Sequence, residues 1–449
     1  MSNNLPPNWS LVKLGDVCEI LDNKRSPINS NERDKRISGK PIESLFPYYG
    51  ATGQVGYIDD YLLEGEFVLL GEDGAPFLEK HKPKAYIVNG KIWVNNHAHI
   101  LLSKNHNKFL CYYLNFLDYH PFVTGTTRLK LNQSSMRQIP IINPPLPEQK
   151  KIVEKIEELF SGLDSGVASL KKAKEQIRLY RQSVLSAAFS GRLVKDEKRE
   201  TKEEFETHLN GVQGVTEQEL LEHLPYKQVV PKAAEPKVGY GKDLPEGWKW
   251  VKLGVVTQLN PKLPFEEIDE NIIVSFLPMR QVEELTGKFD LSMEKKYSEV
   301  KKGFTPFTNG DVIFAKITPC MENGKIAVVN KLKNQVGFGS TEFHVFRVKA
   351  DLVNQYLFYF LIQDTFRAKA QHNMTGAVGQ KRVPKRFLEE SEIPLPPKDQ
   401  QHQIVSEIEK RFSEADNLEK AIDESLTKSE TLRQSILKQA FSGKLIMNN

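Results

Sequence analysis

Three short motifs in the chain have residue types that could do chemistry. Asn143-Pro144-Pro145-Leu146 comes close to the Asx-Pro-Pro-aromatic loop of an N6-adenine methyltransferase, but Leu146 has no ring to stack on a flipped base. His97 and His99 have the spacing of two residues on one face of a strand and could ligate a metal. No third ligand lies nearby, so we expect a structural or hydrogen-bonding role for them instead. Gly324-Lys325 lacks the upstream glycine and the Ser or Thr of a phosphate-binding loop. We therefore expect a non-enzyme with no catalytic residue, no metal site and no cofactor of its own.

Composition and charge are those of an ordinary globular chain. The 449 residues suggest two to four domains, with 39% hydrophobic and 27% charged residues. No apolar run is long enough for a membrane span and no secretory-signal pattern opens the chain, so we expect a cytoplasmic protein. The three cysteines are too far apart for a disulfide framework or a zinc pair. The net charge of +4 is compatible with nucleic acid but does not by itself indicate it.

The elements that must position any functional residue occur twice. RQSVLSAAFSGRLV at 181–194 and RQSILKQAFSGKLI at 433–446 are identical at nine of fourteen positions. The same offset of 252 residues aligns the Pro-Pro stretch at 144–153 with that at 396–405, and Trp-Ser-Leu-Val-Lys-Leu-Gly at 9–15 has its counterpart further along the chain. Such a repeat indicates two copies of one plan, in which a strand-rich block is followed by a proline hinge and a long helix ending at Phe-Ser-Gly.

A heptad pattern marks both long helices. Apolar residues recur at alternating spacings of four and three, which is typical of a coiled-coil seam, although Arg411 and Ser425 interrupt the second copy. Each helix is expected to span about 44 residues, or roughly 65 Å. The two helices would pair antiparallel if a pseudo-twofold axis relates the halves. We expect the Phe rings before the final glycines to contact the partner helix or a partner subunit. The predicted seam and partner-contact residues are Ile152, Ile156, Leu163, Leu170, Ile177, Val184, Phe189, Ile404, Ile408, Ile422, Ile436 and Phe441. Val184 with Ile436, and Leu185 with Leu437, are expected to serve the seam.

The two blocks are rich in short β-branched and aromatic runs separated by Gly, Asn and Asp, which predicts strands. These runs lie at 66–70, 85–88, 311–315, 326–329 and 343–347, and the aromatic patches at 109–117 and 355–362 are expected to be core helices. We predict an α+β fold of two strand-rich globular domains separated by a pair of long antiparallel coiled-coil helices, with a pseudo-twofold internal repeat. The expected segments are block 1 (1–143), helical spacer 1 (144–194), a polar linker with short helices at 203–209 and 217–224 (195–240), block 2 (241–395) and helical spacer 2 (396–446).

These features together resemble the specificity (S) subunit of a type I restriction-modification system. The resemblance covers nearly the whole chain apart from the linker. It rests on the two Pro-Pro hinges, on the twin RQS and FSG endings, and on phrases within the blocks. Those phrases are YYGATGQVGYID at 48–59, ITPCMENGK at 317–325, GFGSTE at 337–342 and MTGAVGQKR at 374–382.

The resemblance implies a function for each part of the chain. Each block would be a target-recognition domain that reads one half of a bipartite, asymmetric DNA site, and the helices would fix the gap between the halves. The S subunit is non-catalytic and binds two modification (M) subunits, which methylate adenine with S-adenosylmethionine. Two restriction (R) subunits complete an ATP-dependent nuclease. S-adenosylmethionine, ATP and Mg are therefore expected on the partner subunits.

Candidate DNA contacts follow from the chemistry of reading bases and holding phosphates. Bases are read by paired donors and acceptors, and phosphates are held by Lys, Arg, Ser, Thr or bare amides. Loops rich in these residues predict a DNA-binding set. In block 1 the set is Tyr48, Tyr49, Gly50, Thr52, Glu72, Thr126, Thr127, Arg128 and Lys130. In block 2 it is Lys316, Thr318, Asn323, Lys325, Thr341, Gln380, Lys381 and Arg382. Glu72, like Glu342, could accept from cytosine or hold an Arg in place.

Two other functions are compatible with the residues. One is a coiled-coil adaptor with two protein-binding β domains and no DNA specificity. The other is a fused methyltransferase-specificity protein, which would need a cofactor loop that the sequence does not contain. Binding of duplex DNA and of S-adenosylmethionine by the purified chain would separate these alternatives.

Overall fold

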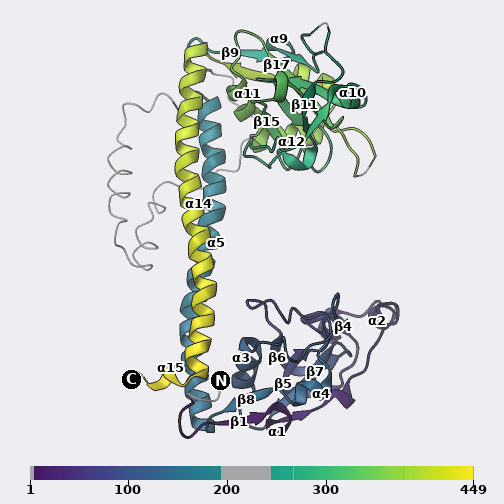
Figure 1. Cartoon of the computed structure of the whole chain (residues 1–449), viewed down its shortest axis with the longest axis vertical. Coiled ribbons are helices and arrows are strands. Elements are labelled where there is room, and N and C mark those ends of the chain that lie inside the picture. Colours follow the sequence, from purple (N-terminus) through teal and green to yellow (C-terminus); the bar gives the residue numbers. More distant parts are fainter. Residues whose placement is uncertain (1–4, 194–243, 266, 378, 448–449) are drawn as a thin grey trace. The chain divides into compact units, whose positions relative to one another are not determined.

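The computed structural model describes residues 5–193, 244–265, 267–377 and 379–447. They fall into two compact units: unit 1 is Met1–Lys171 with Ile422–Asn449, and unit 2 is Lys172–Ala421. Each unit holds one strand-rich block and part of each long helix (Figure 1). Within the described ranges, no helix is long and apolar enough to cross a membrane. The short helices expected at 203–209 and 217–224 lie outside the described residues.

Block 1 is built on a six-stranded sheet of order β2-β7-β5-β6-β3-β4. The middle of β5 is buried on both faces. Phe67 and Leu69 join one core cluster and Val68 and Leu70 another, as the twofold alternation of strand side chains requires. The strands are β2 (Cys18–Ile20), β3 (Phe46–Gly50), β4 (Gly53–Ile58), β5 (Leu63–Gly71), β6 (Ala85–Val94) and β7 (Ala98–Ser103).

Short helices and a two-stranded ribbon complete block 1. The ribbon pairs β1 with β8 antiparallel. Helix α3 supplies five buried residues, so the aromatic patch expected in the core is confirmed. The elements are β1 (Ser10–Lys13), α1 (Leu14–Val17), α2 (Ser30–Ile37), α3 (Asn107–Phe116), α4 (Gln133–Arg137) and β8 (Pro140–Asn143).

Block 2 repeats this strand plan with shorter strands. β14 pairs with β17 as β5 pairs with β7, and β11 runs parallel to β16 as β3 does to β6. Two shorter strands replace each of β5 and β6, which gives sheets of order β10-β17-β14-β15 and β12-β11-β16-β13. The strands are β10 (Thr257–Leu259), β11 (Ile273–Leu277), β12 (Glu294–Lys296), β13 (Thr305–Thr308), β14 (Val312–Ala315), β15 (Ile326–Val328), β16 (Val336–Gly339) and β17 (Phe343–Val348).

The remaining elements of block 2 also have counterparts in block 1. A ribbon of β9 and β18 corresponds to that of β1 and β8. Six of the eight residues of α11 are buried, which confirms the second aromatic patch as core. The elements are β9 (Lys249–Lys252), α9 (Leu253–Val256), α10 (Tyr297–Val300), α11 (Asn354–Leu361), α12 (Asp364–His372), α13 (Lys385–Glu390) and β18 (Glu392–Leu395).

The repeated Pro-Pro stretch is a joint bonded to the first turn of each long helix. In unit 1, Trp9 Nε1 donates to Glu148 Oε2 at 2.7 Å, and Gln149 Nε2 donates to the Pro144 carbonyl at 2.9 Å. The equivalent donors in unit 2 are Trp248 Nε1 to Gln400 Oε1 (2.9 Å) and Gln401 Nε2 to the Pro396 carbonyl (3.0 Å). The same bonds in both halves show that the repeat extends to side-chain contacts.

The two long helices, α5 (Leu146–Phe189) and α14 (Lys398–Phe441), have 44 residues each. In unit 1, Arg433 of α14 ion-pairs with Asp164 of α5 and lies 4.2 Å from the centre of the Phe160 ring. In unit 2 the equivalent residues repeat these contacts: Arg181 bonds Asp416 at 2.6 Å and lies 5.3 Å from the centre of the Phe412 ring. The earlier of these two α5 residues, Asp164, therefore meets the later α14 residue, Arg433. The later α5 residue, Arg181, meets the earlier α14 residue, Asp416. The two helices are thus antiparallel. The predicted fold class is confirmed.

The Phe-Ser-Gly endings are buried in the blocks. The Phe441 ring packs on α3, with ring centres 5.0 Å from Tyr113 and 5.6 Å from Phe109. The Phe189 ring packs on α11, 4.8 Å from Tyr356. An aromatic pocket of a block takes up each ring, which our expectation of contacts with the partner helix or a partner subunit did not include. The helix that follows block 1 thus ends in the core of block 2, and the helix that follows block 2 ends in the core of block 1.

The other predicted seam residues divide between the block cores and the mid-helix seam. Leu163, Ile177 and Ile422 are half-buried. Leu170 is buried, at 9% exposure. Those near the helix ends belong to block cores: Ile152, Ile156 and Ile436 with Leu437 in block 1, and Val184, Leu185, Ile404 and Ile408 in block 2. Val184 and Leu185 thus pack in the core of block 2, and their repeat equivalents Ile436 and Leu437 pack in the core of block 1.

The final glycines are needed for two reasons. Gly191 and Gly443 have φ of +71° and +78°, the left-handed region that favours glycine. A Cβ at Gly191 would also lie 2.1 Å from Pro245 Cγ, and one at Gly443 would lie 2.5 Å from Pro6 Cγ. Each ending is therefore docked against the first residues of the block that it completes.

Candidate nucleic-acid interface

The loop before each hinge forms a short hairpin anchored to a core strand. We call residues 124–130 loop 1 and residues 375–382 loop 2. Loop 1 closes when the Lys130 amide donates to the Thr124 carbonyl at 2.8 Å, and the amide of the next residue, Leu131, donates to the Glu72 carbonyl at 2.7 Å. The glycine after Thr124 has φ of +97°. The tip of the loop therefore projects from a rigid base.

Loop 2 has the same design. The Arg382 amide donates to the Thr375 carbonyl at 2.8 Å, and the Val383 amide donates to the Lys316 carbonyl at 2.8 Å. Gly376 has φ of +121°. The parallel placement of the two loops before both hinges, inferred from the sequence, is matched by equivalent hydrogen bonds.

A buried histidine holds the end of each loop. His99 Nε2 lies 2.8 Å from the Leu131 carbonyl, and His344 Nε2 lies 3.0 Å from the Val383 carbonyl. The other ring nitrogen of each bonds an Asx side chain: Asp22 Oδ2 for His99 at 2.6 Å and Asn260 Nδ2 for His344 at 3.1 Å. Asp22 also accepts a hydrogen bond from the Ile100 amide, and Asn260 accepts one from the Val345 amide. Each of these amides belongs to the residue that follows the histidine. Each loop is thus tied through a histidine to the residues that follow β2 in block 1 and β10 in block 2.

The chemistry of these two anchors differs. Burial lowers the pKa of His344, partly opposed by its bond to the Val383 carbonyl, so the neutral ring is favoured. Burial alone would raise the pKa of Asp22, but hydrogen bonds from His99, the Ile100 amide and Gln133 hold that pKa below its usual value. Asp22 is therefore a carboxylate, and its bonds to His99 and Gln133 join it to the loop base.

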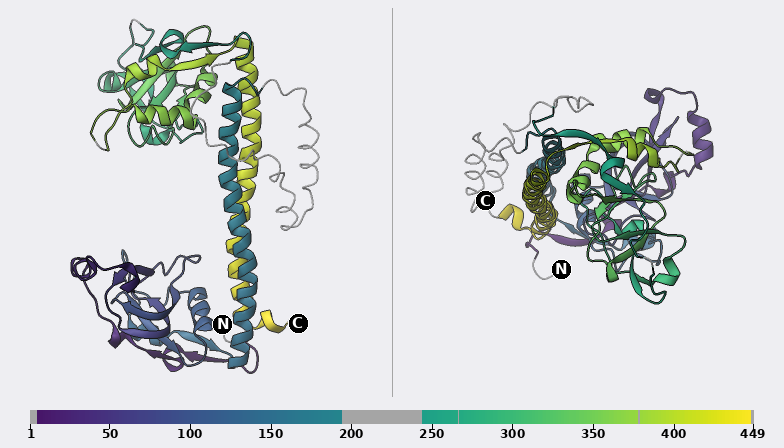
Figure 2. Two further views of the ribbon diagram at one scale, coloured as in Figure 1. Left: turned by 180° about the vertical axis from the view of Figure 1, so that it is seen from behind. Right: turned by 90° about the horizontal axis from the view of Figure 1, so that it is seen from above.

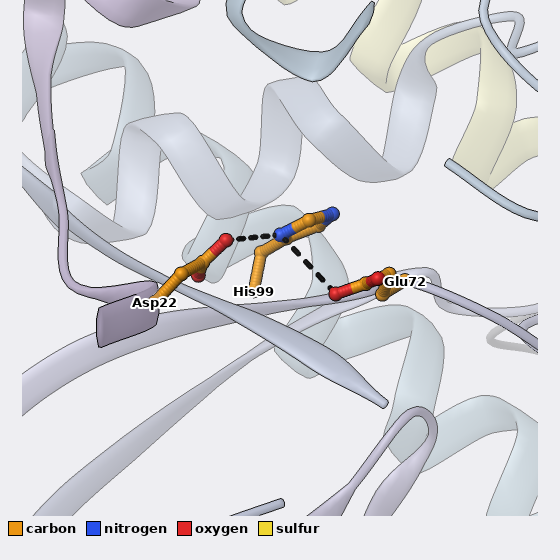
Figure 3. Close-up of side chains that lie close together, drawn as sticks. All are labelled: Asp22, Glu72 and His99. Carbon is orange, nitrogen blue, oxygen red and sulfur yellow. Dashed lines mark hydrogen bonds and ion pairs between the residues drawn. The ribbon is translucent and has the colours of Figure 1, made fainter. Parts of the chain in front are cut away.

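Asp22, Glu72 and His99 lie close enough together to suggest a metal centre (Figure 3). The guanidinium of Arg25 already lies beside both carboxylates, forming an ion pair with Glu72 and lying 3.5 Å from Asp22. A resident arginine compensates the charge that a metal ion would otherwise balance. The arrangement fits a hydrogen-bonded anchor better than a metal site. This agrees with the hydrogen-bonding role that we expected for His99.

His97 does not share the face of a strand with His99. It precedes β7, and its Nδ1 lies 2.6 Å from Asp73 Oδ1. The same carboxylate oxygen accepts from Arg128 Nη2 at 3.1 Å. Our expectation of two same-face strand residues was therefore wrong, since β7 begins one residue after His97.

The basic side chains of loop 1 remain accessible. The Arg128 side chain is 62% exposed despite its bond to Asp73. Lys130 Nζ lies 3.2 Å from Glu72 Oε1. Thr126 and Thr127 are exposed. Glu72 lies between Arg25 and Lys130, so the alternative in which this carboxylate holds a cation in place is the one that the geometry favours.

In loop 2 the guanidinium of Arg382 is already bonded. Its Nε and Nη2 donate to the two oxygens of Glu342 at 2.9 and 2.8 Å, and its Nη1 donates to the Gln380 carbonyl at 3.0 Å. The bond from Arg382 is also the main reason why the pKa of Glu342 is lowered. The guanidinium fork that would read a guanine is therefore occupied, and Arg382 positions the loop. Gln380 and Lys381 are exposed on the loop and can reach a ligand.

The predicted tyrosine loop is only partly available. Tyr48 is 2% exposed, packs with Ile58 and Trp93, and bonds the backbone of Ile28 through its hydroxyl. Its predicted DNA contact is therefore wrong, because the ring is part of a core. Gly50 is buried and Tyr49 is half-buried. Thr52, in the β3–β4 turn, is exposed.

Several block 2 candidates hold the fold together. Lys325 Nζ donates to the Val282 carbonyl at 2.8 Å, and Thr318 Oγ1 donates to Glu322 Oε1 at 2.7 Å. The Lys325 ammonium thus supports the fold through a backbone carbonyl, and its contact with DNA stays a prediction. Asn323 is exposed and donates to Glu284 at 2.8 Å. Thr341 is exposed and Lys316 is half-buried, the latter next to the Glu342–Arg382 pair.

A cleft of about 530 Å³ brings parts of block 1 together that are distant in the sequence. Thr52 from the β3–β4 turn lines it with Thr127 and Arg128 of loop 1. Lys82, whose Nζ lies 2.7 Å from Glu79 Oε2, also lines the cleft, as do apolar residues that include Phe77. Three of the residues predicted to bind DNA thus share one concave surface.

The sequence reasoning missed the residues that support these loops. Arg25, Asp22, Asn260 and His344 were not identified. The bonds Asp22–His99 and Asn260–His344 are recognised as equivalent only when the strands of the two blocks are aligned by their hydrogen bonds. The helix contacts of Arg181 and Arg433 could have been found, because the 252-residue offset also aligns their partners.

Comparisons with known proteins agree with this architecture. The family model described as the type I restriction modification DNA specificity domain matches residues 6–176 and 245–428. The specificity subunit of the type I restriction enzyme EcoAI of Escherichia coli is 34% identical over 300 residues, which are 64% of this chain and 49% of that protein. The chain thus spans about half the length of that relative. The EcoDI specificity subunit of Escherichia coli is 24% identical over 99% of this chain and 90% of that protein.

A solved structure has the same fold. It comes from work on the structural basis of complex assembly and conformational transition of the type I R-M system. Its TM-score is 0.65 at 18% identity, over 98% of this chain and 99% of that one. The two segments matched by the family model include both blocks and most of both long helices. The chain belongs to the family of type I restriction-modification DNA specificity proteins.

Proposed function

We propose that this chain is the DNA sequence-specificity subunit of a type I restriction-modification complex. Block 1 reads one half of a bipartite, asymmetric site and block 2 reads the other. The observation that carries the proposal is that both blocks present an anchored hairpin at the same place, with different side chains at its tip. Loop 1 offers Thr126, Thr127 and Arg128, whereas loop 2 offers Gln380 and Lys381. A common scaffold with different readers suits two different half-sites.

The long helices fix the gap between the half-sites in this proposal. A helix of 44 residues is about 66 Å long at 1.5 Å per residue. Adding one heptad to α5 between residues 171 and 172, and one to α14 between 421 and 422, adds about 10.5 Å, or about three base pairs at 3.4 Å each. Sequencing of the methylated sites should then show a gap longer by about three base pairs and unchanged half-sites.

The chain itself carries no catalysis in this proposal. Two modification subunits dock on it and methylate an adenine in each half-site with S-adenosylmethionine. Two restriction subunits complete a nuclease that uses ATP and Mg. The complex acts in the cytoplasm. The pseudo-twofold repeat of joints and helix contacts supports two equivalent docking positions, since identical partners need matched surfaces.

DNA binding by the chain co-expressed with its modification subunit tests the function. We expect an electrophoretic shift of a 40-base-pair duplex that carries the motif methylated by the wild-type complex. Lys381→Ala with Gln380→Ala should weaken that shift and leave the subunit assembly intact. A chain that assembles with its partners but shifts no duplex would instead be an adaptor.

A further inference from the structure

Residues 24–40 of block 1 form a basic segment that none of the predicted contacts includes. It contains Lys24, Arg25, Arg33, Lys35, Arg36 and Lys40 against two acidic residues, Glu32 and Asp34. We call this segment the basic arm. It follows the first sheet strand, β2, and contains α2. Lys24 and Lys35 are exposed, and Arg33 is half-buried. The arm is thus a concentration of positive charge that the fold itself does not neutralise in full.

The start of the arm is bonded to the base of loop 1. Arg25 Nη1 donates to the Ala98 carbonyl at 3.1 Å and forms an ion pair with Glu72. Glu72 also forms an ion pair with Lys130 at the end of loop 1. Arg25, Glu72 and Lys130 therefore form one chain of alternating charges. The arm leaves the sheet beside the loop that we predict to contact DNA.

Helix α2 then lies beside strand β4 (Figure 1), and Figure 2 shows the same block from two further sides. The guanidinium of Arg33 lies 5.0 Å from the centre of the Tyr48 ring, and it would be 3.4 Å from a Cβ at Gly56. Gly56 is in β4, which begins one residue after Thr52. Thr52 lines the same cleft as Arg128. Cationic and hydroxyl groups therefore follow one another from loop 1, past the β3–β4 turn, to α2.

Two cations in the arm hold its shape. Arg36 and Lys40 both bond Asp59, the latter at 2.7 Å. These bonds lower the pKa of Asp59, with that from Lys40 the largest contribution. Arg36 also lies over the Trp93 ring at 5.1 Å. The C-terminal end of the arm is therefore fixed to the sheet, so that Lys24, Arg33 and Lys35 are held in place for a partner.

The whole connection between β2 and β3, residues 21–45, has six basic and four acidic residues, whereas the equivalent connection in block 2 is acidic. Residues 260–272, between β10 and β11, contain one lysine and four acidic residues. The acidic residues are Glu266, Glu267, Asp269 and Glu270. The two blocks share a strand plan, so this charge difference is a property of the inserted segment and not of the fold. A repulsive segment at this place in block 2 argues that only block 1 extends its contact here.

We propose that the basic arm is a second phosphate-binding element of block 1, in which Lys24, Arg33 and Lys35 contact the DNA backbone beyond the bases read by loop 1. This inference rests on the proposed function. Lys and Arg contacts to phosphates position a protein on the duplex without reading its sequence. Block 1 then holds its half-site with more backbone contacts than block 2 does.

The test is a triple variant, Lys24→Gln, Arg33→Gln and Lys35→Gln, in the complex with the modification subunit. Each lost phosphate contact lowers the slope of log K against log salt by about 0.9 and weakens binding by about fivefold at roughly 0.15 M salt. Three contacts give a slope lower by about 2.7 and binding weaker by about a hundredfold. Fluorescence anisotropy with a 40-base-pair duplex carrying the wild-type motif measures both quantities.

The matched control removes three exposed lysines from α14: Lys410→Gln, Lys420→Gln and Lys428→Gln. It has the same change of charge and should leave the slope unchanged. A triple variant that keeps the wild-type slope and affinity would overturn the proposed phosphate contact. A changed half-site in its methylated motif would also overturn it, because phosphate contacts do not read bases. So would a variant that no longer binds the modification subunit, since the arm would then be a subunit contact. If the wild-type complex binds no duplex, the proposed function itself fails, which is a distinct result.

Discussion

Removing the ring of Phe441 should destabilise block 1, although Phe441 lies about 300 residues after that block in the chain. The ring is 3% exposed and contacts three aromatic rings of α3, from Phe109, Tyr113 and Phe116. A Phe→Ala change in such a core costs about 3–5 kcal/mol. The loss falls on block 1 although Phe441 follows block 2 in the chain. Phe189→Ala should have the same effect on block 2.

Hydrogen exchange followed by mass spectrometry measures this effect block by block. Some amides exchange only when the whole unit opens. A cost of about 3–5 kcal/mol raises the exchange rate of these amides by about two to four orders of magnitude. In Phe441→Ala we expect faster exchange in peptides of α3 and no change in those of α11. Leu432→Ala, at a residue that is 47% exposed on the same helix, is the control and should change neither. If α3 keeps its protection, or if α11 loses it, the crossed assignment of helix ends to blocks is wrong.

Three further predictions concern the loops and their anchors. Glu342→Gln removes the carboxylate that holds Arg382, so the affinity for the motif relative to random duplex should fall by about tenfold, or about 1.4 kcal/mol, while the affinity for random duplex stays the same. An unchanged ratio would refute the positioning role of Arg382. Gly125→Ala puts a Cβ 2.5 Å from the Arg128 carbonyl at φ +97°, a strain of about 1–3 kcal/mol, and should weaken DNA binding, whereas Gly162→Ala in open helix surface should not. Because the folded pKa of His344 is lowered, unit 2 should be most stable above about pH 6.5 and lose stability as the pH falls below it; denaturant unfolding at pH 7.5 and 5.5 that gives equal stability would contradict this.

Much of the architecture could be predicted because it depends on local patterns. The heptads and the 252-residue offset predicted two long helices, and the observed helices have 44 residues each. Runs such as 66–70 and 343–347 fall within β5 and β17. These features follow from side-chain periodicity along one segment of chain, which the sequence displays directly.

The partners of each element could not be predicted in the same way. Phe441 and Phe189 were assigned to a helix or subunit interface. Phe441 ends the helix that follows block 2 but packs in block 1, and Phe189 ends the helix that follows block 1 but packs in block 2. Tyr48 was assigned to DNA because its loop is rich in glycine, but its neighbours in space, Ile58 and Trp93, make it core. Contacts between distant segments depend on strand order and register, which leave no local trace in one sequence.

The candidate site shows the same division. Loops 1 and 2 were predicted from composition and position, and their tips are exposed as a contact requires. The supporting residues Arg25, Asp22 and His344 were missed. Their role depends on hydrogen-bond partners that are distant in the sequence, and these partners are known only from the fold. Arg382 was grouped with the readers because its type suits guanine, but its bonds to Glu342 make it a support.

Sequencing of methylated sites in cells that express this chain with its modification subunit tests the central claim most directly. The account predicts one bipartite motif with two specified halves and an unspecified gap. In the Gln380→Ala and Lys381→Ala variant only the half read by block 2 should change, with the gap and the other half kept. A continuous motif, or a variant in which both halves change together, would contradict the claim that two separate readers share this chain.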